Sequence, residues 1–436
     1  MQIRKKYLFA LVMALMVVPP LMKELSATFG FSISPLKGYI KYATKPDFTW
    51  HAWFDGSFQE GYDKYLEDHI GLRNIFVRIH NQIDFSLFNI GHGAGIVIGK
   101  DHYLYETNYI LAYTGKDFLG EEFIMEKCRK IRSVQDSLLN YNTHLVVVLP
   151  PGKASFFPEY IPDEFMDDGI GITNNKTYLR HFIENGIHHL DFNGWFTAMR
   201  DTSRLPLYHK CGIHWNIYGA YLALDSLIRY IEDVKSFDMV DINTAGIEMS
   251  KKPRYTDYDI GDALNLLFRI PGRAMPYPVG FSYDTTGKEK PNLMVIADSY
   301  YWTIYNLPDS KLLWGEQDFR YYNQASYTPG KKEESPAVLT IEELAKFDVI
   351  MVMYTEANMT KFADDFFEDA WLTFNYRKEI DSLRTKIINS PDWMNDIQRK
   401  ADEKGISRDD MLRLDAIWLL KHEMEKQQQT KKENGI

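Results

Sequence analysis

The fold is decided by the stretch LVVVLPPGK at residues 145–153. Its first five residues form a continuous apolar run, which is typical of a strand buried on both faces. The following Pro-Pro-Gly stops that strand abruptly. Two similar apolar runs lie at residues 293–297 and 349–353, and amphipathic helical stretches separate the runs. The sequence therefore predicts an α/β fold with a mainly parallel sheet and helices on both faces.

Composition and charge restrict the class of protein. The chain has 436 residues, of which 45% are hydrophobic and 25% charged, values that exclude a disordered chain, a collagen and a polytopic membrane protein. The formal net charge of −10 argues against a nucleic-acid partner, which needs a basic face. The only cysteines, Cys128 and Cys211, form no CxxC spacing, and whether they pair is left open. We expect no metal, and no glycine-rich cofactor motif is present.

The amino terminus predicts export. Arg4, Lys5 and Lys6 precede residues 7–22, which carry no charge. A basic flank before an apolar run marks a signal anchor or a cleaved signal peptide, and both alternatives are kept for residues 1–24. The positive flank keeps the amino terminus in the cytoplasm. The remainder is expected in the periplasm or another extracytoplasmic space, held by one inner-membrane helix or secreted after cleavage.

The rest of the chain divides into two expected parts. Residues 58–362 contain the alternating strands and helices, and residues 363–436 read as a charged helical extension. Within the first part, Phe58–Asn89 predicts a helix, and Gly95–Glu106 predicts short strands around a turn.

Two strand ends and one helix start carry candidate site residues. Ser299 follows the apolar run at 293–297, where its hydroxyl and the amides of a following helix can serve acyl chemistry. His214 stands just before an amphipathic helix and can act as general base for a serine. Lys153, after the first run, can orient a substrate. Taken singly, each has an ordinary structural alternative as a turn, hydrogen-bonded or solvated loop residue.

Taken together, these motifs resemble a known family. The order PPGK, then HW with a following YGAYLAL helix, then a strand ending in DS, is similar to the SGNH hydrolase-like acyltransferases of the alginate O-acetylation group, AlgJ and AlgX. The likeness extends upstream to DHIGLR at 68–73 and GKDHYLY at 99–105, and covers roughly Phe58 to Phe362. It implies an SGNH-like, flavodoxin-like three-layer fold.

The resemblance also implies roles for single residues. Ser299 would be the nucleophile that accepts an acetyl group, and His214 would be the base that activates it. The family places its acid two residues before the histidine, and that position here is Gly212. The acid is therefore expected elsewhere, with Asp191, Asp298 and Glu356 as candidates, unless a Ser–His dyad or a backbone carbonyl replaces it, or activity is lost.

The oxyanion of the reaction needs hydrogen-bond donors. The Ser299 amide is the first candidate. The segment after the run at 349–353 is expected to supply a second donor from Tyr354 or Asn358.

The sequence therefore predicts an O-acetyltransferase that modifies an exported or cell-envelope polysaccharide through an acyl-serine intermediate. A membrane-bound O-acyltransferase is the implied partner that delivers the acetyl group. A glycan O-acetyl esterase with the same site is the first alternative. A catalytically silent glycan-binding or scaffold protein is the second, supported by Gly212.

Overall fold

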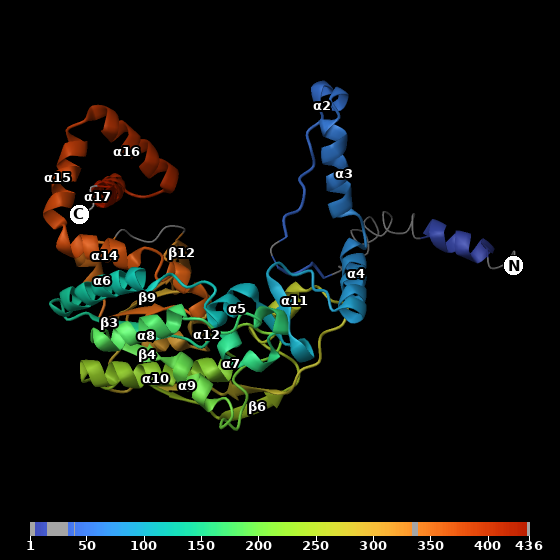
Figure 1. Ribbon diagram of the computed structural model, residues 1–436, viewed down its shortest axis with the longest axis horizontal. Coiled ribbons are helices and arrows are strands. Elements are labelled where there is room, and N and C mark those ends of the chain that lie inside the picture. Colours follow the sequence, from blue (N-terminus) through green and yellow to red (C-terminus); the bar gives the residue numbers. More distant parts are fainter. Residues whose placement is uncertain (1–4, 15–33, 39, 334–338, 434–436) are drawn as a thin grey trace. The chain divides into compact units, whose positions relative to one another are not determined.

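The computed structural model describes residues 5–14, 34–38, 40–333 and 339–433 (Figure 1). The chain forms two compact units. The first comprises Met1–Glu106, Lys210–Gly212 and Tyr258–Gly272, and the second comprises Thr107–His209, Ile213–Asp257 and Arg273–Ile436. The domain limits expected at 58–362 and 363–436 stay predictions.

The predicted signal segment is described only in part. Residues 5–14 form a helix, whereas residues 15–24 lie outside the described part of the chain. Among the described residues, no helix has both the length and the apolar character needed to cross a membrane.

The first unit is helical, with one small hairpin. Its elements are α2 (Trp50–Phe54), α3 (Ser57–His69), α4 (Arg73–Phe88), β1 (Ile96–Ile98), η1 (Lys100–His102), β2 (Leu104–Glu106) and α11 (Asp259–Ala263). The predicted helix Phe58–Asn89 is broken into α3 and α4, because Leu72 adopts a left-handed conformation with φ of 65°. The predicted short strands are confirmed, since β1 pairs antiparallel with β2 around η1.

The second unit is built on a seven-stranded sheet of order β12-β11-β10-β9-β13-β3-β4. Its strands are β3 (His144–Leu149), β4 (His189–Asp191), β9 (Leu293–Ala297), β10 (Gln317–Tyr321), β11 (Ala325–Thr328), β12 (Lys331–Glu333) and β13 (Val349–Met353). The five strands from β10 to β4 run parallel, and β11 and β12 extend the sheet antiparallel. The α/β class is thus confirmed, with a mixed sheet. Two pairs outside this sheet are β5 (Asp241–Asn243) with β8 (Ser282–Asp284), and β6 (Gly246–Ser250) with β7 (Met275–Val279).

Helices cover both faces of this sheet (Figure 1). They are α5 (Thr107–Thr114), α6 (Glu121–Leu139), α7 (Lys153–Phe156), α8 (Asn174–Glu184), α9 (Phe192–Met199), α10 (Ile217–Lys235), α12 (Tyr301–Tyr305), α13 (Ile341–Leu344) and α14 (Phe366–Asn375). The last three helices, α15 (Arg377–Ile388), α16 (Pro391–Lys404) and α17 (Arg408–Glu433), pack on one another around an apolar cluster of their own. Short 3₁₀ turns are η2 (Pro158–Tyr160), η3 (Asp163–Phe165), η4 (Ser310–Leu313) and η5 (Glu356–Lys361).

The core forms because the three apolar runs are buried on both faces. Every residue of β3, β9 and β13 is buried. Apolar side chains of α6, α8 and α14 pack against one face, and α10 lies on the other, where Tyr230 hydrogen-bonds His144 (Figure 1).

Cys128 is a buried thiol in α6, so the two cysteines do not pair. Burial raises the pKa of this thiol to about 12, which makes it unreactive.

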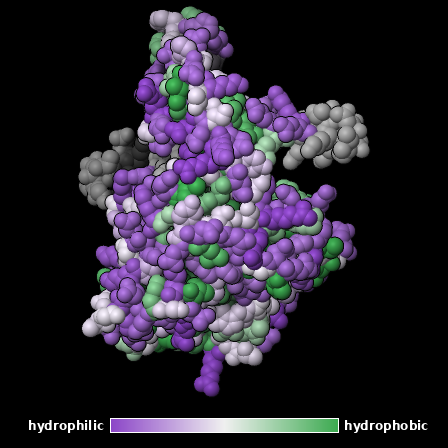
Figure 2. Space-filling model, turned by 90° about the vertical axis from the view of Figure 1, so that its left-hand side faces the viewer, coloured by the Kyte–Doolittle hydropathy of each residue, from purple (hydrophilic) through white to green (hydrophobic). Residues whose placement is uncertain are grey.

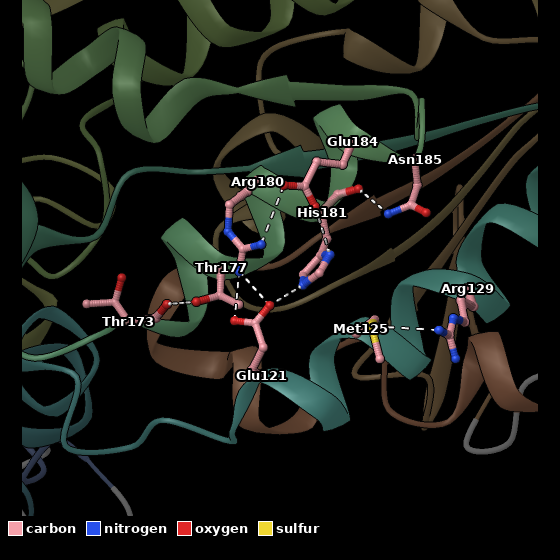
Figure 3. Close-up of polar contacts among 9 residues, drawn as sticks. All are labelled: Glu121, Met125, Arg129, Thr173, Thr177, Arg180, His181, Glu184 and Asn185. Atoms are coloured by element: carbon pink, nitrogen blue, oxygen red, sulfur yellow. Dashed lines mark hydrogen bonds and ion pairs between the residues drawn. The ribbon is translucent and has the colours of Figure 1, made fainter.

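A polar cluster joins α6 to α8 (Figure 3). The Glu121 carboxylate, in the first turn of α6, accepts a hydrogen bond from Arg180 Nη2 at 2.7 Å and lies 2.7 Å from His181 Nε2. Thr173 caps α8 by accepting a hydrogen bond from the Lys176 amide. These contacts fix the register of two helices that share one face of the sheet.

The face drawn in Figure 2 is mostly hydrophilic, with hydrophobic residues scattered in small groups. Scattered apolar residues are normal on a protein surface in contact with water.

The packing of α8 gives the first testable prediction. Phe182→Ala should lower the free energy of unfolding by about 3–5 kcal/mol, because Phe182 is fully buried and its truncation leaves a cavity. The neighbouring Ile183, which is 66% exposed, provides the control. Ile183→Ala should change stability by less than about 1 kcal/mol in urea unfolding. Equal losses for the two variants would contradict this account of the core.

Candidate active site

The structure brings Ser299 and His214 together. His214 Nε2 lies 2.8 Å from Ser299 Oγ, although the residues are 85 positions apart in the chain. This separation is within the range of a nucleophile and its general base. The predicted contact is therefore present in the second unit.

A buried carboxylate fixes the loop that carries Ser299. Asp298 is fully buried at the end of β9. Its Oδ2 accepts hydrogen bonds from the Thr355 amide at 2.8 Å, the Thr355 hydroxyl at 2.7 Å and Asn358 Nδ2 at 2.9 Å. Its Oδ1 accepts from the Tyr300 amide at 3.0 Å. These bonds join the carboxyl ends of β9 and β13 and fix the backbone on both sides of Ser299.

The imidazole is held by its own chain segment and by Tyr300. Asn216 caps α10 by accepting a hydrogen bond from the Gly219 amide at 2.7 Å. The buried Tyr300 hydroxyl donates to the Ile213 carbonyl at 2.7 Å, and its ring lies 4.8 Å from the His214 ring. Because Tyr300 directly follows Ser299, the same residue sets the position of both site members.

The three carboxylates that were candidates for the triad acid accept hydrogen bonds from groups other than His214. Asp191 caps α9 by accepting a hydrogen bond from the Gly194 amide, and Asp298 holds the strand ends. Glu356 accepts hydrogen bonds from Ser155 and Asn193. The described structure brings none of these three carboxylates into hydrogen-bonding contact with His214.

One site residue, Tyr322, is missed by the sequence analysis. It directly follows β10, which runs parallel to β9, so both strands end at the same edge of the sheet. Burial raises the pKa of the Tyr322 hydroxyl far above its usual range, while an interaction with the Ser299 side chain lowers it in part. The hydroxyl is therefore neutral and able to donate. A tyrosine at the end of the neighbouring strand was the available signal, but the mixed polar sequence of β10 hides that strand.

The other predicted donors lie in different positions. Tyr354 is buried, and its hydroxyl donates to Asp364 Oδ2 at 2.5 Å. Asn358 is close to the site, but its amide donates to Asp298. Lys153 is fully buried at the start of α7 rather than solvated. The Ser299 amide has no hydrogen-bond partner among the described residues, which leaves it available to an oxyanion.

A second buried carboxyl lies at the ends of β13 and β3. Glu356 is 4% exposed, and both of its oxygens lie 2.7 Å from the Ser155 hydroxyl. A side chain on Gly152 would meet Glu356 Oε1 at 1.9 Å, which explains why the Pro-Pro-Gly turn ends in glycine. Burial raises the pKa of Glu356 to about 7, against the opposing effect of the Ser155 and Asn193 hydrogen bonds. The carboxyl borders a pocket of about 630 Å³.

The chain is similar to known acetylation proteins. Residues 96–267 match the family described as SGNH hydrolase-like domain, acetyltransferase AlgX. The resemblance predicted from the sequence is thus confirmed, and the matched segment contains His214 but ends before Ser299.

Two curated relatives agree with this match. The probable alginate O-acetylase AlgJ of Pseudomonas syringae pv. tomato is 26% identical over 192 residues, which are 44% of this chain and 46% of that protein. Its counterpart in Pseudomonas aeruginosa is 22% identical over 210 residues, which are 48% and 50% of the two chains. The solved O-acetyltransferase domain of Pseudomonas putida AlgJ aligns with a TM-score of 0.39 and 13% identity, over 64% of this chain and 98% of that one. The chain thus spans half or less of the length of these curated relatives.

The Glu356 carboxyl predicts a pH dependence of stability. Its pKa is about 7 in the folded protein, above the ordinary value of 4.5, so the folded state binds this proton more tightly than the unfolded state. Ionisation then costs stability progressively as the pH rises from about 4.5 through about 7, up to about 3 kcal/mol at alkaline pH.

We expect Glu356→Gln to remove this cost. The variant should gain stability relative to the wild type between about pH 5 and about pH 8, measured by urea unfolding at each pH. Glu122→Gln, on the exposed side of α6, is the control and should show no such trend. A Glu356→Gln effect of the same size at every pH would contradict the raised pKa.

Proposed function

We propose that the protein is an O-acetyltransferase that modifies an exported or cell-envelope polysaccharide, with Ser299 as nucleophile and His214 as general base. The observation that carries this proposal is the 2.8 Å contact between Ser299 Oγ and His214 Nε2 at the carboxyl edge of the sheet. Ligands of open α/β sheets bind at that edge. The match to an acetyltransferase family supports the reaction class.

In the first step, His214 Nε2 takes the proton of the Ser299 hydroxyl. The oxygen attacks the carbonyl carbon of the acetyl donor, and negative charge develops on the carbonyl oxygen. The Ser299 amide and the neutral Tyr322 hydroxyl are the donors available to that oxygen. Collapse of the tetrahedral intermediate forms the acetyl-serine ester, and the leaving group takes the proton from His214.

In the second step, a sugar hydroxyl replaces the donor. His214 removes its proton, the sugar oxygen attacks the acetyl-serine carbonyl, and Ser299 Oγ leaves as the acetylated sugar forms. Oγ recovers its proton from His214, so the site returns to its starting state.

Residue 212 is glycine, so this chemistry runs without a carboxylate at the family's usual position. A triad acid orients the imidazole and stabilises the imidazolium. Tyr300 and the Asn216 cap hold the backbone on the two sides of His214.

A groove next to the site fits a sugar chain. Tyr322 lines a hollow of about 880 Å³ whose walls also carry Lys127, Lys130, Lys421 and Trp371. Acidic side chains, among them Glu368, line the same hollow, and Lys127 is buried beside Glu368. An aromatic ring and polar side chains of both charges suit the apolar faces and hydroxyl groups of a polysaccharide. By family resemblance, the acetyl group would come from a membrane-bound O-acyltransferase, with the protein held at the extracytoplasmic side of the membrane by residues 1–24.

The esterase alternative uses the same site with water as acceptor. The short Ser299–His214 contact favours either enzyme over a silent binding protein. The products separate the two enzymes, because only a transferase places the acetyl group on the added sugar.

The nucleophile is tested with Ser299→Ala. Incubation with an acetyl-ester donor and an oligosaccharide acceptor should give acetylated sugar, detected by mass spectrometry. Ser299→Ala should lower the rate at least about 10³-fold, because no second hydroxyl can form the ester. Ser137→Ala, in α6, removes a hydroxyl that donates to the Ser133 carbonyl within the same helix, and should keep full activity.

The products of the wild type decide between transferase and esterase, and the comparison with Ser299→Ala decides on the binding protein. Acetate release without acetylated sugar would replace the transferase by the esterase. Equal rates for the wild type and Ser299→Ala would exclude Ser299 as nucleophile and favour the binding protein.

The second oxyanion donor is tested with Tyr322→Phe. Loss of one such donor typically lowers kcat by about 10²–10³-fold, with little change in KM. Tyr141→Phe is the control, because Tyr141 lies just before β3, at the opposite edge of the sheet. An unchanged kcat in Tyr322→Phe would remove this residue from the mechanism.

A further inference from the structure

Three potential metal ligands converge in the first unit, outside the candidate active site. His80 and Asp84 lie one turn apart on α4, and His92 follows the helix. His92 Nε2 lies 2.6 Å and His80 Nε2 3.4 Å from the same carboxylate oxygen, Asp84 Oδ2. The ligand atoms of the three residues lie within 4.8 Å of one another. The two imidazoles stack with their centroids 5.2 Å apart.

The turn after α4 builds this arrangement. Asn89 adopts a left-handed conformation with φ of 55°, and its amide donates to the Phe85 carbonyl. The Ile90 amide donates back to the Asp84 carbonyl at 3.2 Å. This is the hydrogen-bond pattern of a closed helix end, and it returns the chain over the last turn of α4. His92 is thereby directed back to Asp84.

The separation of His80 and Asp84 fits a tetrahedral transition metal, and the other ligand atoms lie within reach of the same ion. Bond lengths of about 2.0–2.1 Å to nitrogen and oxygen imply about 3.3 Å between ligand atoms. The His80–Asp84 separation of 3.4 Å already has this value. The His92–Asp84 distance is a hydrogen bond and would lengthen by less than about 1 Å as a metal ion replaces the shared proton.

We propose that His80, Asp84 and His92 bind one Zn²⁺ ion through the two Nε2 atoms and one carboxylate oxygen, with water in the fourth position. Two imidazoles and one carboxylate are a ligand set that zinc prefers, whereas Mg²⁺ and Ca²⁺ prefer oxygen alone. The ion would clamp the segment after α4 onto that helix. This proposal is independent of the proposed acetyl transfer.

The test measures Zn²⁺ binding directly. The purified full chain is treated with a chelator, exchanged into metal-free buffer and titrated with ZnCl₂ by isothermal calorimetry. We expect one ion per chain and a rise in Tm on zinc addition, with no comparable binding of MgCl₂ or CaCl₂. His92→Asn and His80→Asn should each weaken zinc binding about 100-fold or more, since even loss of an outer-shell partner costs about 10–100-fold.

The chain offers a matched control. His51 lies 3.0 Å from Asp55, one turn away, and no third metal ligand lies close to this pair in the described structure. His51→Asn should therefore keep wild-type zinc affinity. Circular dichroism and the zinc-free Tm show whether each variant is folded.

Three results would overturn the proposal. They are the absence of a zinc isotherm for the wild type, wild-type affinity in folded His92→Asn, and equal loss of affinity in His51→Asn.

Discussion

The candidate site depends on the buried carboxylate of Asp298. A charged group without solvent is stable only if hydrogen bonds replace its hydration, and four donors do so here. Three of these donors belong to the segment after β13, and the fourth is the amide next to Ser299. The position of Ser299 is therefore set by the hydrogen bonds that its neighbour Asp298 accepts. In this protein the Asp of the Asp-Ser pair is a structural anchor, not the partner of the imidazole.

The same principle recurs along this edge of the sheet. Tyr300 bonds the carbonyl before His214, and Glu356 bonds Ser155 across the ends of β13 and β3. The first contact joins the end of β9 to the segment before α10, and the second joins the ends of β13 and β3. The sheet holds these ends in register, and the polar contacts then fix side chains to within hydrogen-bonding distance. Such fixed dipoles are what stabilise developing charge without reorganisation.

The sequence predicted the parts of the fold that arise from strong local patterns. The apolar runs predicted three strands of the sheet. The order of the motifs predicted Ser299 and His214 as site residues. Tyr322 could not be found, because β10 has the sequence QDFRY, in which Arg320 is buried against Asp318, and such a strand lacks an apolar signature. Tyr354 was predicted as a donor to the site, but in the folded protein its hydroxyl donates a hydrogen bond to Asp364. Side-chain direction at a strand end is set by tertiary packing, which residue types alone do not encode.

The strand order has a consequence for how the protein acquires its site. β13 lies in the middle of the sheet, between β9 and β3, yet it is the last of the seven strands in the chain. Until residues 349–353 have been made, β3–β4 and β9–β10 are two separate halves with exposed apolar edges. Such late, non-local pairing slows folding and exposes strands to aggregation. The donors to Asp298 arrive with the same segment, so a nascent or truncated chain would hold both Ser299 and His214 and still lack an ordered site.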